Sequence, residues 1–139
     1  MPLQSAYGSY FVQLEPNTVA AVNVNSTSAN TTHTLTSAAT TNATVVKNSA
    51  GRVSLIALTN TNAADRFFKL YSKATAPTVG TDIPIMTIPV AANSFRIIDF
   101  SAFGLQIPVG IGYAVTGLIA DSDATAISAG DFKVVITFT

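Results

Sequence analysis

The stretch Arg52-Val-Ser-Leu-Ile-Ala-Leu-Thr59 decides the fold class, because most of it consists of the β-branched and apolar residues that strands favour. The apolar residues 55–58 are consecutive rather than alternating, which is typical of a central strand with both faces covered. Turn-forming residues follow in Asn60-Thr-Asn-Ala-Ala-Asp65, and Arg66-Phe-Phe-Lys-Leu-Tyr-Ser72 again has strand composition. The sequence therefore predicts a central hairpin formed by residues 52–72.

The second strand of this hairpin alternates between two kinds of side chain. Phe68 and Leu70 share one face, whereas Lys69, Tyr71 and Lys73 share the other, which we expect to meet solvent. Together with the nearby Arg66, these cations and the tyrosine also fit a small basic patch that could stack on a nucleic acid strand. A solvated strand face is favoured, because so few cations on a chain of net charge +0 are a weak indication of nucleic acid binding.

Strand patterns recur along most of the chain on both sides of this hairpin. We predict strands at residues 9–14, 19–25, 44–47, 85–89, 94–100, 111–119 and 133–138, while residues 32–36 fit an edge strand or a surface loop equally well. In the last strand Val134, Ile136 and Phe138 are expected to point inward, but alternation leaves the inward face of residues 94–100 undecided.

The spacing of these strands indicates the fold class. Roughly eight to ten short strands, with turn residues about every 8–12 positions, predict an all-β chain. We expect a single antiparallel β-sandwich of jelly-roll type. Residues 1–12 are predicted to be an extended N-terminal arm or a first edge strand, and residues 13–139 to form the sandwich domain.

The composition is unusually poor in charge. Charged residues make up 10% of the chain and the formal net charge is +0, against about 25% charged residues in ordinary soluble domains. This balance argues against a nucleic-acid-binding protein and favours an oligomer or assembly component over a free monomer. Residues 101–120 carry no charge, but four glycines and Pro108 within them favour a loop and a buried strand over a membrane helix.

Groups that carry chemistry are sparse. His33 is the only histidine and the chain has no cysteine, so we expect neither a transition-metal site nor a catalytic triad. Asp121-x-Asp123 begins like a calcium loop, but Ala126 and Phe132 stand where glycine and glutamate are needed, so a turn capped by aspartates is favoured. The sequence predicts a protein that is not an enzyme and needs no cofactor.

Several runs of residues from position 45 onward form a recognisable set: Lys69-Leu-Tyr-Ser-Lys-Ala-Thr-Ala-Pro-Thr-Val-Gly-Thr-Asp82 with the preceding Asn60-Thr-Asn-Ala-Ala-Asp-Arg-Phe-Phe68, then Ile85-Met-Thr-Ile-Pro-Val90, Gly110-Ile-Gly-Tyr-Ala-Val-Thr-Gly117 and Ala120-Asp-Ser-Asp-Ala-Thr125. In these runs the chain resembles a family of small structural proteins of tailed bacteriophages. Residues 1–44 match the family pattern poorly. Within such virion proteins the chain is most similar to a capsid cement, or decoration, protein.

This resemblance implies a location and partners. It implies a protein on the outer surface of the capsid that binds the major capsid protein and stabilises the assembled head, as a homo-oligomer with a trimer favoured. We expect Tyr7, Tyr10 and Phe11 to make contacts there, because aromatic residues dominate interface energetics. The alternative is a tail, fibre or baseplate module that binds a host-surface receptor or glycan, with Tyr71 and Tyr113 stacking on sugar rings.

Overall fold

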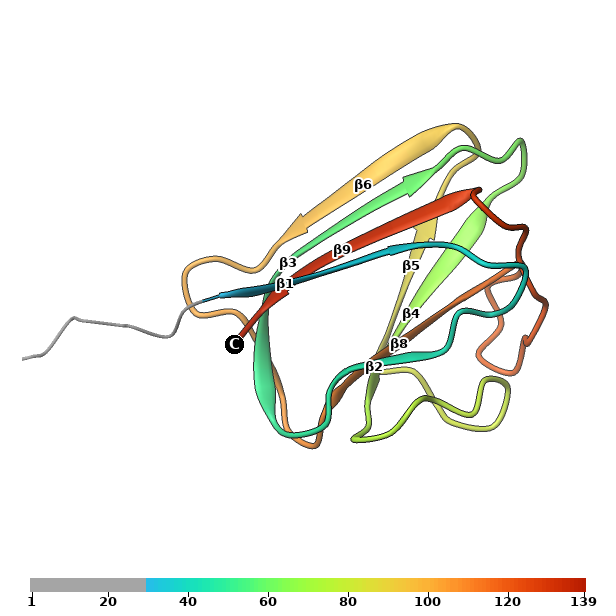
Figure 1. Cartoon of the computed structure of the whole chain (residues 1–139). Helices are drawn as coiled ribbons and strands as arrows, with labels where there is room; N and C mark the ends of the chain where they lie inside the picture. Colours follow the sequence, from blue (N-terminus) through green and yellow to red (C-terminus); the bar gives the residue numbers. More distant parts are fainter. Residues whose placement is uncertain (1–29) are drawn as a thin grey trace, which may run out of the picture.

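A computed structural model describes residues 30–139 of the chain, which form nine β-strands. The strands pack as two layers, and Asn30 and Thr139, the first and last described residues, lie on the same side (Figure 1). The strands are β1 (Thr31–Thr36), β2 (Thr44–Lys47), β3 (Gly51–Asn60), β4 (Arg66–Ser72), β5 (Met86–Val90), β6 (Ser94–Asp99), β7 (Leu105–Ile107), β8 (Ile111–Thr116) and β9 (Phe132–Phe138).

The strand order is that of a jelly roll. One sheet has the order β1-β9-β3-β6, with the short β7 also paired to β3, and the other has the order β2-β8-β4-β5. All these pairs are antiparallel. The partners are nested, since β1 pairs with β9, β2 with β8, β3 with β6 and β4 with β5, as when one long hairpin is rolled into two layers. The predicted β-sandwich of jelly-roll type is confirmed.

The core lies between the two sheets. Every residue of β8 is buried, and in β9 Val134, Ile136 and Phe138 face inward as the alternation predicts. Tyr113 of β8 stacks on Phe68 of β4, with ring centroids 5.2 Å apart. Residues 32–36, which fitted a strand or a loop, belong to edge strand β1. Strand β3 is central as predicted, but the expectation that both its faces are covered is wrong, because Leu55, Ala57 and Thr59 on its outer face are not buried.

The predicted hairpin of residues 52–72 is wrong, because its two strands belong to different sheets. Residues 61–65 carry the chain from β3 in one layer to β4 in the other (Figure 1). The buried amide of Asn60 donates to the carbonyl oxygens of Ala64, Val90 and Ala91, so it joins this crossing to the next one, between β5 and β6. Residues 60–65 were correctly identified as turn-forming, but they connect the two sheets and not two neighbouring strands of one sheet.

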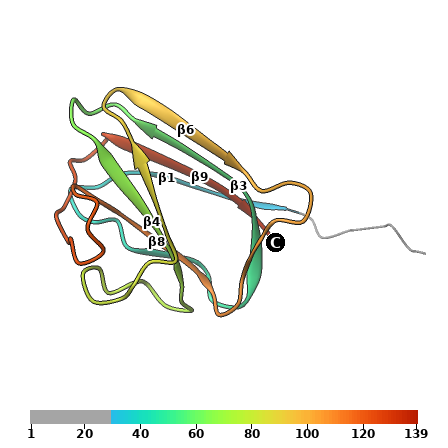
Figure 2. The ribbon, with the colours of Figure 1, turned by 180° about the vertical axis from the view of Figure 1, so that it is seen from behind.

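The expectation that Lys69 and Tyr71 face solvent is also wrong. Their side chains are 0% and 1% exposed, because residues 73–85 and 117–126, here called the covering loops, lie over the outer face of the β2-β8-β4-β5 sheet (Figure 2). One loop places Pro77 against Gly112 of β8, which is the register partner of Tyr71. The two loops also touch each other where Gly80 meets Ser122.

Residues 101–120 contain the expected loop and buried strand, but the predicted loop also includes the short strand β7, and the buried strand is shorter than predicted. Strand β8 ends at Thr116, and Ile119 lies beyond it with 60% of its surface exposed. Within residues 30–139, no helix is long and apolar enough to cross a membrane.

Candidate interaction surfaces

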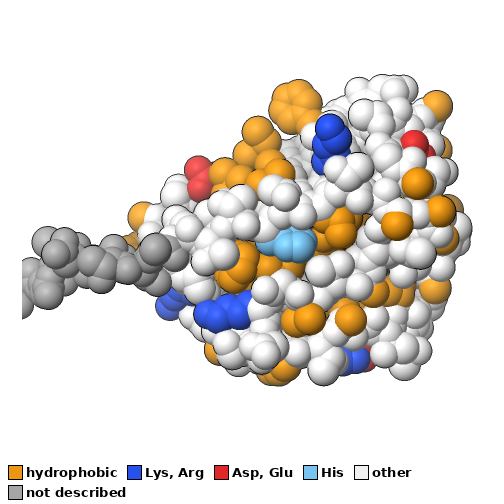
Figure 3. Space-filling model, viewed as in Figure 1, with side chains coloured by type: hydrophobic (Ala, Val, Ile, Leu, Met, Phe, Trp, Pro, Cys, Tyr) orange, Lys and Arg blue, Asp and Glu red, His pale blue; other side chains and the backbone are white. Residues whose placement is uncertain are grey.

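His33 of edge strand β1 is half-buried, and its register partner Ile136 faces the core. Its Nε2 lies 3.0 Å from the hydroxyl of Tyr113, and the ring remains visible at the surface beside hydrophobic side chains (Figure 3). Burial lowers the pKa of His33 and raises the pKa of Tyr113 to about 12, although a hydrogen bond with Thr44 opposes the second shift. Among the described residues no three His, Cys, Asp or Glu side chains are grouped to hold a metal ion.

We expect His33 to make the protein less stable in mild acid. Because its folded pKa is lower than the unfolded value of 6.5, its contribution is complete above pH 6.5 and is lost as the pH falls below that value. Asp82 and Asp123 have pKa values lowered from 3.8, so their protonation reduces the stability only at pH values below this window. Urea unfolding between pH 7 and pH 5 should show falling stability, and His33→Gln should flatten this dependence. An unchanged slope in the variant would contradict the assignment.

The Asp121-x-Asp123 segment is organised around an internal ammonium group. Nζ of Lys69 donates to the carbonyl oxygens of Ala120 at 2.6 Å and Asp123 at 3.1 Å. The Asp123 carboxylate accepts hydrogen bonds from the backbone N–H of Leu118 and the hydroxyl of Thr125. Burial lowers the pKa of Lys69, against the opposing charges of Asp123 and Asp121. The capped turn predicted here is therefore present, with lysine as its cation.

The two tyrosines assigned to sugar stacking are not on the surface. Tyr71 is 1% exposed beneath the covering loops, and Tyr113 is 0% exposed in the core. Neither ring can therefore stack on a ligand at the surface, and their prediction as interface residues is corrected. The missed signal for Tyr113 is its position between Gly112 and Ala114, small residues that allow close packing around a buried strand.

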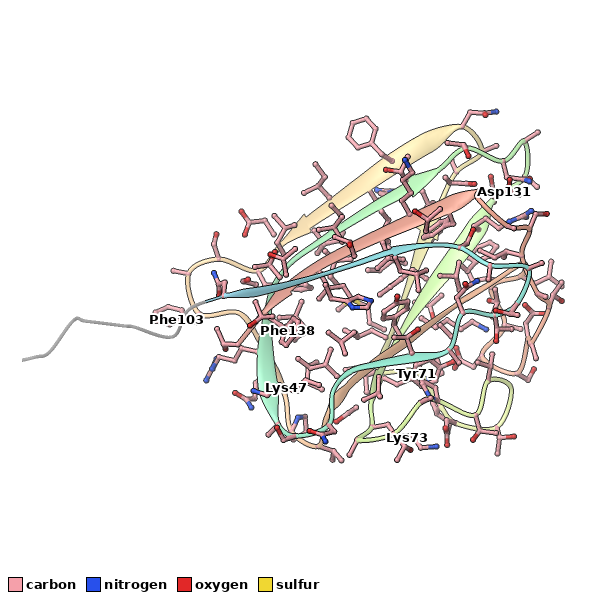
Figure 4. All side chains as sticks on the ribbon, in the orientation of Figure 1. Lys47, Tyr71, Lys73, Phe103, Asp131 and Phe138 are labelled. Carbon is pink, nitrogen blue, oxygen red and sulfur yellow. The ribbon has the colours of Figure 1, made fainter. Side chains whose placement is uncertain are left out.

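The basic patch considered for nucleic acid does not form either. Lys69 is buried, and the ammonium of Lys73, which is labelled in Figure 4, pairs with the carboxylate of Asp82. The same carboxylate accepts the backbone N–H of Thr78, which ties the first covering loop to the end of β4. The pKa of Asp82 is lowered chiefly by its hydrogen bond with Lys73 and then by that with Thr78.

The outer face of the β1-β9-β3-β6 sheet, in contrast, is not covered by any part of residues 30–139. Register fixes its members, because Val134 and Ile136 point inward and their neighbours in β9 must point outward. None of the side chains on this sheet face is buried, and Phe95 and Ile97 are 67% and 59% exposed. The sheet face consists of Thr32, Thr34 and Thr36 of β1, Lys133, Val135 and Thr137 of β9, Leu55, Ala57 and Thr59 of β3, and Phe95, Ile97 and Asp99 of β6.

A second candidate surface lies at the end of the sandwich where residue 30 begins the described chain. It is a hollow of about 950 Å³, here called the end surface, and Phe103, 85% exposed, projects beside it (Figure 4). The guanidinium of Arg52 donates to the carbonyl oxygen of Phe103 at 2.8 Å. The described residues that line it include two cations and no acid: Asn30, Lys47, Ala50, Gly51, Arg52, Ser54, Ala102, Phe103, Gly104, Gln106 and Thr139.

Sequence reasoning placed its interface residues elsewhere. Tyr7, Tyr10 and Phe11, the predicted arm of residues 1–12 and the predicted strands 9–14 and 19–25 all lie outside the described residues. Phe95 and Ile97 were not identified as surface residues, because their strand pattern Phe-Arg-Ile-Ile allows either face to be the inner one. Pairing with β3 decides this, since Phe95 is opposite Thr59 and Ile97 is opposite Ala57.

The comparisons with known proteins include a distant structural likeness. No protein-family model matches the chain, and no curated protein matches it in sequence. Among solved structures, the chain is similar to the coat protein of Tobacco streak virus, with a TM-score of 0.34 and 13% sequence identity. That alignment covers 78% of this chain and 85% of the coat protein chain.

Proposed function

We propose that this chain is a non-enzymatic structural protein of a tailed-bacteriophage particle, and that it acts as a cement protein on the outer surface of the capsid. The observation that carries the proposal is the uncovered, nearly uncharged sheet face, which lies on four hydrogen-bonded strands. Such a face is depleted in charge and carries exposed aromatic and aliphatic groups, as the centres of protein interfaces are. The resemblance of residues 45–139 to small virion proteins supports the same role.

A cement protein stabilises a shell because it binds only the assembled state. Many copies, each held weakly, act together through mass action and multivalency. In this proposal the major capsid protein is the partner, and the protein is a homo-oligomer, with a trimer favoured by the resemblance. A rigid sandwich is suited to this role, since little conformational freedom of the described residues is lost on binding.

The quantity that tests this function is the copy number in purified particles. Quantitative mass spectrometry should find a ratio near one-to-one with the major capsid subunit, because cement covers the whole head. A ratio of a few per cent or less would contradict the cement role and favour the tail, fibre or baseplate module. Absence from the particle would contradict any virion role.

The N-terminal arm is expected to contribute to attachment. Asn30, the first described residue, lines the end surface, and the one charged residue of segment 1–29, Glu15, is opposite in sign to Lys47 and Arg52 there. Deleting residues 1–12, which removes Tyr7, Tyr10 and Phe11, should abolish binding to capsids that lack this protein, measured by co-sedimentation.

Two controls accompany this deletion. Its thermal unfolding should match that of the full chain, because the core of the described sandwich lies within residues 53–138. Full-length protein in which Tyr7, Tyr10 and Phe11 are all alanine should lose binding to a similar extent. Undiminished co-sedimentation of both variants would show that the arm does not hold the capsid.

A further inference from the structure

Loops of the described chain cover one outer face of the sandwich but not the other. Over the β2-β8-β4-β5 sheet the covering loops bury even a lysine and a tyrosine, Lys69 and Tyr71. Over the other sheet nothing within residues 30–139 buries any side chain of the sheet face. An outer face that carries exposed apolar groups is a typical site of association with another molecule.

The pattern of side chains on the sheet face indicates what covers it. Successive rows across β1, β9, β3 and β6 are Thr36, Lys133, Thr59, Phe95, then Thr34, Val135, Ala57, Ile97, then Thr32, Thr137, Leu55, Asp99. The centre is thus apolar and small. The two charges are of opposite sign, and they lie in opposite outer rows, two strands apart.

We propose that a second copy of this chain binds to the sheet face, so that two sheet faces pack against each other about a two-fold axis. Lys133 and Asp99 are separated by two strand spacings of about 4.8 Å and four residues of about 3.4 Å, or roughly 17 Å along the diagonal. The two-fold axis runs parallel to the two packed faces, through the midpoint of that diagonal and perpendicular to it. It places each Lys133 opposite Asp99 of the other copy. A two-fold interface requires such mutual complementarity, because one patch must bind itself.

The same axis makes the apolar centres coincide. Ala57 lies at the midpoint of that diagonal, so it meets Ala57 of the second copy, and Val135 beside it faces the apolar centre of that copy. The strands of the two sheets then cross steeply, as in orthogonally packed sandwiches. Phe95 and Ile97, at the β6 edge, extend the apolar contact beyond the flat centre.

The size of the sheet face sets the expected strength of the pair. Four strands about 4.8 Å apart and five residues about 3.4 Å apart give a patch of roughly 19 by 17 Å. This area is less than the ~800 Å² that each partner contributes to a standard interface. We therefore expect a weak dimer, whose fraction is small in dilute solution and rises with protein concentration. The pair and the proposed cement role use the same sheet face, so a second copy would compete there with a capsid protein, whereas a trimer contact at another surface would leave this face free.

Sedimentation equilibrium of the full-length chain, over a wide concentration range, tests the proposal. The wild-type protein should show a reversible monomer–dimer equilibrium. Ala57→Arg should raise the dissociation constant of the dimer by about tenfold or more, because it puts a large cation at the centre of the interface. Ile83→Arg is the matched control, since Ile83 is 78% exposed but lies in a covering loop outside the sheet face. It should leave the association unchanged.

A charge exchange tests the two-fold arrangement itself. Lys133→Glu alone should weaken the pair, because it places Glu opposite Asp99, whereas the double variant Lys133→Glu with Asp99→Lys should restore it. Thermal unfolding of each variant shows whether the sandwich is intact. The inference would be overturned if no dimer formed at any concentration, or if Ala57→Arg formed a dimer as readily as the wild type. A trimer that forms equally in wild type and Ala57→Arg would also overturn it, while leaving the cement proposal standing.

Discussion

Replacing Lys69 with methionine should lower the free energy of unfolding by roughly 3 kcal/mol, although the residue lies in no candidate interaction surface. Methionine keeps the apolar stem in its place but removes the ammonium, which is 0% exposed. The carbonyl oxygens of Ala120 and Asp123 then lose their donor inside the protein. Because this ammonium joins β4 to the second covering loop, we also expect residues 117–126 to become more susceptible to proteolysis.

Lys73→Met is the matched control for this prediction. Lys73 lies four residues further along the same chain segment, but its ion pair with Asp82 is partly exposed, with side-chain exposures of 32% and 28%. Such pairs contribute about 1 kcal/mol or less. Urea denaturation at pH 7 should therefore separate the two variants clearly, and equal losses of stability would show that burial of the Lys69 ammonium is not the cause.

Gly110→Ala should be about as damaging, with a loss of roughly 3 kcal/mol, although the position has no unusual backbone angle. A Cβ atom there would lie 2.7 Å from both the Cα of Ala74 and the carbonyl oxygen of Lys73. Both are backbone atoms, so relief requires the start of β8 to move away from the end of β4. That movement would break the 2.8 Å hydrogen bond from the N–H of Lys73 to the carbonyl oxygen of Gly110.

Gly130→Ala is the control for Gly110→Ala, because it tests the cost of a positive φ at a position where the added methyl group meets no other atom. Gly130 has a φ of +78°, but no atom lies within 4 Å of the position that a Cβ atom would take, so alanine there should cost only about 1 kcal/mol. Chemical denaturation of the two variants side by side provides the measurement. A larger loss for Gly130→Ala than for Gly110→Ala would mean that the close approach at β8 is easily relieved.

Several elements could be predicted because their signal is local. Consecutive apolar residues 55–58 indicated a central strand, and β3 is paired on both sides. Alternation in residues 133–138 indicated the inward face of β9, where Val134 and Ile136 are buried. The number and spacing of such strands were sufficient for the jelly-roll prediction, since short antiparallel strands without helices leave few other arrangements.

Other features depend on which segments meet in space. The turn at residues 60–65 looks the same whether it joins two neighbours in a sheet or crosses between sheets, and only pairing with β6 and β9 distinguishes them. The face with Lys69 and Tyr71 has the pattern of a solvent-exposed strand, yet loops about 50 and 10 residues away in sequence cover it. Sequence pattern alone therefore gave the wrong surface for the candidate site.

The nested pairing of strands also has a consequence for how the chain folds. Strand β1 binds only β9 within the described chain, and their register joins Thr31 to Phe138 across almost the full length of the domain. Such distant contacts are closed late and slow the folding of β-rich proteins. During synthesis β1 must therefore wait, with its hydrogen-bonding groups unpaired by β9, until β9 has left the ribosome. The sheet that contains β1 can then be completed only after all nine strands have been made.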